Sequence, residues 1–250
     1  MSDRFRLDGK TALVSGAGRG IGLAVAEALA QAGADVTLAA RTADDIEGEA
    51  ARLRAGGYRA KALRLDVLDV LAATDAIATA GPFDVLVNNA GSNRPANFLD
   101  VTPEDYDAVT DLNVRSAFFV AQAVARGLVA AGKPGSIINM SSQMGHVGGQ
   151  KRTVYCATKH AMEGFTKAMA LDLAPHGIRV NTVCPTFIET PMTKPFFADP
   201  VFRETTLAKI PLGRLGQLDD VVGAVIYLAS DASGLVTGSA LRVDGGWTAV

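Results

Sequence analysis

Tyr155 and Lys159 are spaced so that they can take part in one proton transfer. They lie four residues apart in the segment 154–174, where helical periodicity predicts a helix that projects both side chains from one face. A phenol is a poor base at neutral pH, but a neighbouring ammonium favours the phenolate and lowers the pKa of the phenol. The pair therefore predicts proton exchange, in either direction, with an oxygen atom of a substrate.

A glycine-rich turn at residues 15–22 (SGAGRGIG) follows one apolar run and opens a helical segment. Gly16, Gly20 and Gly22 permit a tight turn that brings backbone amides close to phosphate oxygens, and the helix N-terminus adds partial positive charge. About 20 residues separate the turn from the end of the next strand, as a dinucleotide-binding fold requires. Such turns also occur as plain strand–helix connections, but this context favours a nucleotide phosphate site.

The end of the second expected strand bears on the choice between NAD and NADP. An acidic residue there bonds the ribose 2′-hydroxyl of NAD, but this strand ends in Leu38-Ala39-Ala40-Arg41. The guanidinium groups of Arg41 and Arg19 suit a 2′-phosphate, although Arg41 could simply be solvated at a helix start. The sequence favours NADP(H) over NAD(H).

Short apolar runs alternate with helical segments along almost the whole chain. Buried parallel strands read as continuous apolar runs, so this alternation predicts βαβ units and an open parallel sheet covered on both faces. The expected strands are 11–14, 35–39, 62–65, 85–87, 136–140, 178–183 and 241–243, and the expected helices are 21–31, 43–55, 70–80, 103–131, 154–174 and 218–230.

Neither a linker nor a repeat divides the chain, so one α/β domain with a doubly wound parallel sheet is expected over residues 1–250. Gly33 is expected to cap the first helix, and Thr102-Pro103 to start the fourth. Residues 186–213 break the alternation with four prolines. Because this connection is long, it is expected to be a substrate lid.

Composition excludes several classes of partner. Hydrophobic residues make up 48% and charged residues 20%, as in proteins with a large core, and the formal net charge of −2 gives no basic face for nucleic acid or an anionic membrane. Residues 1–10 lack the apolar core of a secretory signal, and the apolar stretch 116–132 is interrupted by polar residues and falls short of the roughly 18 needed to cross a membrane. A cytoplasmic protein without a membrane partner is expected.

Metal binding is not expected from spacing along the sequence. The only cysteines are Cys156 and Cys184, and the three histidines, His146, His160 and His176, are far apart. Two distant cysteines also fit a reducing compartment better than a disulfide framework.

Four motifs together resemble the short-chain dehydrogenase/reductases: the glycine turn at 15–22, residues 88–91 (NNAG), Ser142, and residues 155–159 (YCATK). The resemblance extends from Gly9-Lys10 to the ending at residues 243–246 (VDGG). It implies a Rossmann fold and hydride transfer between a nicotinamide cofactor and a carbonyl or secondary alcohol.

The resemblance also implies the catalytic roles. Tyr155 exchanges a proton with the substrate oxygen, and Ser142 bonds the same oxygen and stabilises its developing charge. Lys159 bonds the nicotinamide ribose, and Asn113 anchors a water that relays protons to Lys159.

Further cofactor contacts follow from the resemblance at single positions. Ile21 belongs to the phosphate turn, Asp66 and Val67 contact adenine, and Asn89 lies on the adenosine side or holds the strands together. Ile188 meets the nicotinamide amide, with Thr190 nearby. In a departure from the family pattern, Pro185-Thr186 stands where the family commonly has Pro-Gly.

The expected substrate is small and polar. Arg94, Gln143, His146 and Gln150 lie in loops expected to border it and offer hydrogen bonds suited to a sugar, polyol or hydroxy acid, unless they face solvent. The alternative is a 3-oxoacyl thioester on an acidic carrier protein, which requires a basic surface. Residues available for such a surface are Arg126, Lys133, Arg152 and Arg203.

Two alternatives outside catalysis are a regulator that senses the cofactor redox state and a structural subunit. The complete set of catalytic residues argues against both. The resemblance also implies a homotetramer formed through the helices at 103–131 and 154–174 and the C-terminal region. Consecutive apolar residues at 118–120 cover more than one helix face, as burial by a partner or by the chain's own sheet requires.

Overall fold

The computed structural model describes residues 3–191 and 193–249, so Met1, Ser2, Met192 and Val250 of the expected 1–250 domain lie outside the described residues. Seven strands build one sheet. They are β1 (Thr11–Ser15), β2 (Asp35–Ala40), β3 (Ala60–Arg64), β4 (Val85–Asn88), β5 (Gly135–Met140), β6 (Ile178–Pro185) and β7 (Ala240–Val243).

The sheet is parallel throughout, in the order β3-β2-β1-β4-β5-β6-β7. The chain moves outward from β1 to β3 and then returns to place β4 on the other side of β1. At such a reversal the loops that follow the two central strands diverge and leave a crevice at the carboxyl edge of the sheet. The order of the strands therefore locates a ligand site after β1 and β4.

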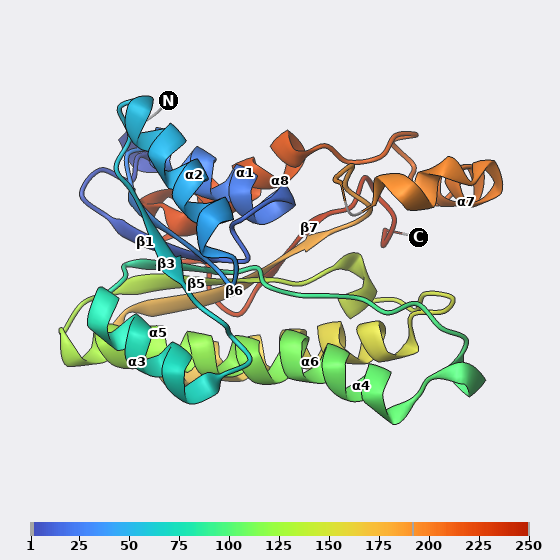
Figure 1. Cartoon of the computed structure of the whole chain (residues 1–250), viewed down its shortest axis with the longest axis horizontal. Helices are drawn as coiled ribbons and strands as arrows, with labels where there is room; N and C mark the ends of the chain where they lie inside the picture. Colours follow the sequence, from blue (N-terminus) through green and yellow to red (C-terminus); the bar gives the residue numbers. More distant parts are fainter. Residues whose placement is uncertain (1–2, 192, 250) are drawn as a thin grey trace.

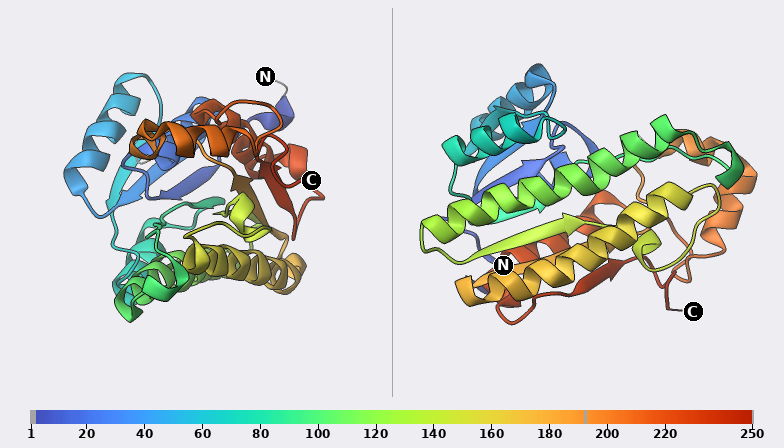
Figure 2. Two further views of the ribbon diagram at one scale, coloured as in Figure 1. Left: turned by 90° about the vertical axis from the view of Figure 1, so that its right-hand side faces the viewer. Right: turned by 90° about the horizontal axis from the view of Figure 1, so that it is seen from below.

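Helices cover both faces of the sheet (Figure 1). One layer contains the first, second and eighth helices, and the other contains the third to sixth. The helices are α1 (Gly20–Gln31), α2 (Ala43–Ala55), α3 (Val70–Ala80), α4 (Pro103–Thr110), α5 (Ser116–Ala130), α6 (Thr153–Leu173), α7 (Pro200–Leu207) and α8 (Leu218–Ala229). In Figure 2, the continuous α4–α5 rod and α6 run side by side.

Strand alternation divides the core into two clusters, one on each face. Ala12 and Val14 of β1 pack with α1, α2 and α8, whereas Leu13 between them packs with α3 and α5. Successive side chains of a strand point to opposite faces, so a continuous apolar run supplies both cores. The expected doubly wound, single-domain α/β sheet is confirmed.

Two expectations about the helices were wrong in detail. The expected helix 103–131 is continuous, but residues Asp111–Arg115 form a π-helical turn between α4 and α5. The segment 186–213, expected as a loop, contains a 3-10 turn (Lys194–Ala198) and α7. Prolines punctuate these short elements, because proline is tolerated in a first helical turn.

The expected helix boundaries are supported by local hydrogen bonds. Thr102 accepts a bond from the backbone amide of Asp105 at 3.2 Å, with Pro103 in the first turn of α4. Gly33 follows α1 with a φ of 109°, a value that suits glycine. Within the described residues, no helix is long and apolar enough to cross a membrane.

Candidate active site

The glycine turn is held against the end of β4. Ser15 Oγ accepts bonds from the backbone amides of Asn89 (3.0 Å) and Ala90 (3.1 Å), and Asn89 Nδ2 donates to the Ser15 carbonyl oxygen at 3.0 Å. A Cβ at Gly22 would collide with the Gly16 carbonyl and the Asn89 side chain, and Gly16 has a φ of 66°. The turn thus forms a close-fitting cradle at the N-terminus of α1, which fits a dinucleotide pyrophosphate.

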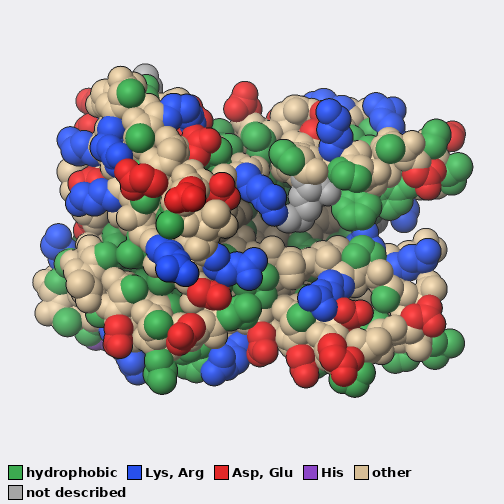
Figure 3. Space-filling model, viewed as in Figure 1, with side chains coloured by type: hydrophobic (Ala, Val, Ile, Leu, Met, Phe, Trp, Pro, Cys, Tyr) green, Lys and Arg blue, Asp and Glu red, His purple; other side chains and the backbone are tan. Residues whose placement is uncertain are grey.

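A cleft of about 450 Å³ runs from this turn across the carboxyl edge of the sheet. Figure 3 shows the surface hollowed between the two helical layers, with basic side chains beside the hollow. Of the residues expected to contact the cofactor, Ile188 is the one that does not line the cleft. It is buried and forms a β-bridge with Gly216. The expected cofactor residues that line the cleft are Gly16, Arg19, Gly20, Ile21, Gly22, Arg41, Asp66, Val67, Asn89, Tyr155, Lys159 and Thr190.

The end of the cleft near β2 contains opposite charges. Arg19 and Arg41 are both exposed there, and Asp66 accepts a bond from the Leu68 amide at 3.0 Å. Asp45 also lines this end, although the sequence did not single it out. An acid in the first turn of a helix is common because it interacts favourably with the helix dipole, so position alone gave no signal for Asp45.

Lys159 is fixed between α6 and β5. Its Nζ donates to the Met140 carbonyl oxygen at 2.6 Å and lies 5.5 Å from the centroid of the Tyr155 ring. Burial lowers the pKa of Lys159 to about 8, against the opposing effect of Cys184 and Glu163. The ammonium therefore lies beside the phenol, as expected from their spacing on one helix.

The pKa of Tyr155 moves in the direction opposite to the expectation. Burial raises it to about 12, while hydrogen bonding with Ser142 lowers it only in part. Desolvation of the phenolate therefore outweighs the stabilising partners in this structure. At neutral pH the phenol is protonated, which is the form that can donate a proton to a carbonyl oxygen.

Ser142 lies two residues after the end of β5, next to the cleft-lining Ser141. Its Oγ accepts from the Met144 amide at 3.1 Å and donates to Gln143 Oε1 at 2.7 Å. The first bond caps a short 3-10 turn, Gln143–Gly145, and fixes the direction of the hydroxyl. Ser142 is also near enough to Tyr155 for its hydroxyl to lower the pKa of the phenol in part.

Asn113 lies in the π-helical turn and is fully buried. Its side chain bonds the backbone of Ser92 in both directions at 2.8 Å, and its Nδ2 donates to Thr158 Oγ1 at 3.1 Å. Thr158 in turn donates to the Tyr155 carbonyl oxygen at 2.8 Å. Asn113 therefore ties the π-helical turn to α6. Its expected water contact stays a prediction. Sequence reasoning missed Thr158, although it lies inside the 155–159 motif.

The four expected substrate residues do not line the cleft. Arg94 is exposed and pairs with Asp105 at 2.7 Å, and Gln150 is also exposed. Gln143 is buried against Ser142. His146 Nε2 lies 3.4 Å from Cys184 Sγ and 3.7 Å from Glu163 Oε1. A role in substrate binding therefore stays a prediction for each of these four residues.

Comparison with known proteins identifies relatives along the whole chain. Residues 16–248 match a family model described as enoyl-(acyl carrier protein) reductase. The chain is 44% identical to D-erythrulose reductase of Gallus gallus, covering 96% of each protein. It is 43% identical to L-xylulose reductase of Bos taurus, covering 98% of this chain and 99% of the relative.

The solved structures include a gluconate 5-dehydrogenase from Burkholderia cenocepacia J2315 in complex with NADP and tartrate. It superimposes with a TM-score of 0.95 at 41% identity, covering 99% of this chain and 98% of that one. The sequence matches and the geometry of the cleft thus indicate the same family. The chain belongs to the short-chain dehydrogenase/reductase family.

Proposed function

We propose that the protein transfers a hydride between NADP(H) and a ketone or secondary alcohol of a small polyhydroxylated substrate, such as a sugar, polyol or hydroxy acid. One observation carries the proposal: Tyr155 and Lys159 line the same cleft as the glycine turn. A proton donor and a dinucleotide cradle therefore meet in one cavity. We assign catalysis to Asn113, Ser142, Tyr155 and Lys159.

When bound, the nicotinamide supplies or accepts the hydride. In the direction of reduction, Tyr155 Oη donates its proton to the carbonyl oxygen as that oxygen gains charge. The Ser142 hydroxyl bonds the same oxygen, and the Lys159 ammonium stabilises the phenolate that remains. In the direction of oxidation, the phenolate takes the proton of the alcohol.

A preference for NADP(H) is supported by the two guanidinium groups of Arg19 and Arg41 at one end of the cleft. Guanidinium forms strong paired hydrogen bonds with phosphate oxygens. Asp45 opposes this preference, because its carboxylate lines the same end. The guanidinium groups of Arg19 and Arg41 support binding of the 2′-phosphate despite the carboxylates of Asp45 and Asp66 at the same end.

A small polar substrate is favoured over a carrier-bound acyl thioester. The two curated relatives are named as reductases of D-erythrulose and L-xylulose, and the solved relative holds tartrate. None of the four basic residues considered for a carrier-protein surface, Arg126, Lys133, Arg152 and Arg203, lines the cleft. Arg152 is buried, and Lys133 pairs with Asp84 at 3.8 Å near the start of β5, at the opposite edge of the sheet.

The segment 186–213 is proposed as a substrate lid. Thr190 and Pro191 line the cleft, so its first part already borders the site. Farther along, Phe187, Phe197 and Phe202 pack against one another with ring centroids 5.6 to 5.7 Å apart. This aromatic contact joins α7 to the start of the segment.

The test is an NADPH-oxidation assay against ketoses, keto-sugar acids and 3-oxoacyl thioesters, with Tyr155→Phe as the control. The proposal is supported if the natural protein turns over a ketose or keto-sugar acid and Tyr155→Phe does not. Turnover of the thioesters only would replace it with the acyl alternative. A regulator would bind NADPH in a titration without turning over any of the three classes.

We also propose a homotetramer in the cytoplasm. Phe118 of α5 and Leu171 of α6 are large apolar side chains that remain exposed, and the Phe118 ring packs on Phe165 across the two helices. Both cysteines are free, which suits a reducing compartment. A monomeric mass by light scattering would contradict the assembly, and recovery in a periplasmic or secreted fraction would contradict the compartment.

A further inference from the structure

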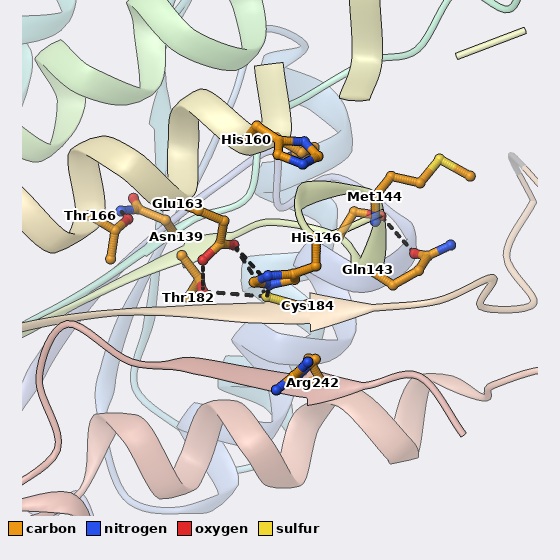
Figure 4. A network of polar contacts seen from close by, with 12 residues as sticks. Asn139, Gln143, Met144, His146, His160, Glu163, Thr166, Thr182, Cys184 and Arg242 are labelled. Atoms are coloured by element: carbon orange, nitrogen blue, oxygen red, sulfur yellow. Dashed lines mark hydrogen bonds and ion pairs between the residues drawn. The ribbon is translucent and has the colours of Figure 1, made fainter. Parts of the chain in front are cut away.

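Three side chains of kinds that bind metal ions converge beside the catalytic residues. His146 follows the 3-10 turn that Ser142 caps, Glu163 lies one helical turn after Lys159, and Cys184 lies near the end of β6. Figure 4 shows the imidazole, carboxylate and thiol pointing toward one another. The proposed reaction uses none of them.

The separations of the donor atoms match those around a small metal ion. His146 Nε2 lies 3.4 Å from Cys184 Sγ and 3.7 Å from Glu163 Oε1, and Sγ lies 3.3 Å from the same carboxylate oxygen. One point lies about 2.0 Å from all three of these atoms. This distance is close to the bonds of about 2.0 to 2.3 Å that zinc makes with nitrogen, oxygen and sulfur. An ion therefore fits with little movement of the donors.

The donor types select the class of ion. A thiol, an imidazole and a carboxylate suit zinc and similar transition metals, whereas magnesium and calcium prefer oxygen alone. Thr182 Oγ1 lies 3.3 Å from Sγ and 3.0 Å from Glu163 Oε2, and this hydroxyl or solvent can complete the coordination. Glu163 and Cys184 are buried, but the His146 side chain is 23% exposed and gives an ion access.

We propose that His146, Glu163 and Cys184 form a binding site for one divalent transition-metal ion, with zinc as the best fit. The ion bonds to Cys184 as the thiolate, and the thiol proton passes to solvent. Imidazole binds neutral through Nε2, and the carboxylate binds through Oε1. The thiolate and carboxylate charges then balance the two positive charges of the ion, which limits its repulsion with the neighbouring ammonium of Lys159.

Proton release is a signature of this binding mode. An ordinary cysteine thiol has a pKa of about 8.5, so it is largely protonated at neutral pH and must lose its proton to bind a metal. Zinc must therefore displace one proton for each ion bound. The bound ion would also join the turn after β5, helix α6 and strand β6, and so raise the thermal midpoint.

The experiment uses the full chain without a histidine tag, titrated with zinc chloride and, separately, cobalt chloride. We expect one ion per chain, release of about one proton on zinc binding at neutral pH, a near-ultraviolet thiolate–cobalt absorption band and a higher melting temperature. Cys184→Ser and His146→Gln are each expected to weaken zinc binding by more than about 100-fold, because outer-shell changes alone cost 10- to 100-fold.

Matched controls are Cys156→Ser and His160→Gln, which change the other cysteine and a histidine of α6 that bonds the Cys156 carbonyl instead. Both should keep the zinc affinity. The proposal is overturned if the natural protein takes up no stoichiometric zinc, if both Cys184→Ser and His146→Gln retain it, or if a control loses it. His146 is partly exposed, so His146→Gln tests the site even where Cys184→Ser fails to fold.

Discussion

Lys159 Nζ lies 2.6 Å from the carbonyl oxygen of Met140, the last residue of β5. This bond fixes α6 to the carboxyl edge of the sheet, where the cleft opens. Because the ammonium is buried, it is held in one place beside the Tyr155 ring instead of moving in solvent. One side chain thus supplies both the charge that we propose supports proton transfer and the bond that positions α6.

Replacing this side chain should therefore remove both effects. Lys159→Met is expected to lower kcat by about 10²- to 10⁴-fold, the usual contribution of acid–base assistance, while the fold is kept. Steady-state kinetics and circular dichroism check this expectation. A kcat within a factor of a few of the natural protein would contradict the assigned role.

Thr158 is expected to position the catalytic helix. Thr158→Val leaves one buried N–H of Asn113 without an acceptor, which should cost about 1–3 kcal/mol of unfolding free energy. Displacement of Tyr155 should lower kcat by up to about 100-fold. Thr158→Ser keeps the hydroxyl and should restore kcat. Failure of serine to restore it would show that packing of the methyl group, and not the hydrogen bond, matters.

Two glycine substitutions compare a glycine that the close-fitting turn requires with a glycine at an exposed helix position. Gly22→Ala places a methyl group against the Gly16 carbonyl, so it should destabilise the fold by about 1–3 kcal/mol and weaken NADPH binding. Gly48→Ala on the exposed side of α2 meets no atom within 4 Å and should stabilise by roughly 0.5–1 kcal/mol. Urea unfolding and NADPH titration measure both effects. Equal changes in unfolding free energy and NADPH affinity in the two variants would argue against the cradle.

The charges near β2 predict how the cofactor preference can be changed. Arg41→Ala should raise KM for NADPH by about 10- to 100-fold and change KM for NADH little, because only NADPH carries the 2′-phosphate. Asp45→Asn removes the opposing carboxylate and should lower KM for NADPH. If Arg41→Ala affects both cofactors equally, Arg41 contributes to packing and not to phosphate recognition.

Asp220 should make the stability of α8 depend on pH. Its hydrogen bonds with Arg214, at 2.6 and 2.8 Å, and with the Gln217 amide lower its pKa to about 2. A carboxyl whose pKa is lower in the folded than in the unfolded state adds stability above its ordinary pKa of about 4, and this is lost as the pH falls toward 2.

Asp220→Asn should therefore lower the melting temperature at pH 7 by about one to three degrees, a small effect because the pair is largely exposed. The difference from the natural protein should shrink in melts recorded below about pH 4. A difference that stays constant between pH 7 and 3 would mean that the ionised carboxylate is not its cause.

The sequence determined the order of strands and helices and the family of this protein. Its apolar runs, glycine turn and the 155–159 motif are local patterns, and local patterns report backbone conformation and spacing on one helix. They could not report the π-helical turn at Asn113, because its residues fit helical periodicity like those on either side. Nor could they show that the Tyr155 pKa rises, since desolvation depends on neighbours from other elements.

Only the tertiary structure brought distant residues together. Asp45 reaches the cofactor cleft because α2 begins beside the glycine turn, and Thr158 meets Asn113 across two helices. His146, Glu163 and Cys184 are widely separated along the sequence, so their spacing gave no sign of a metal site. Parallel β5 and β6 place the ends of two strands at one edge, and α6 packs across them, so the three donors become neighbours.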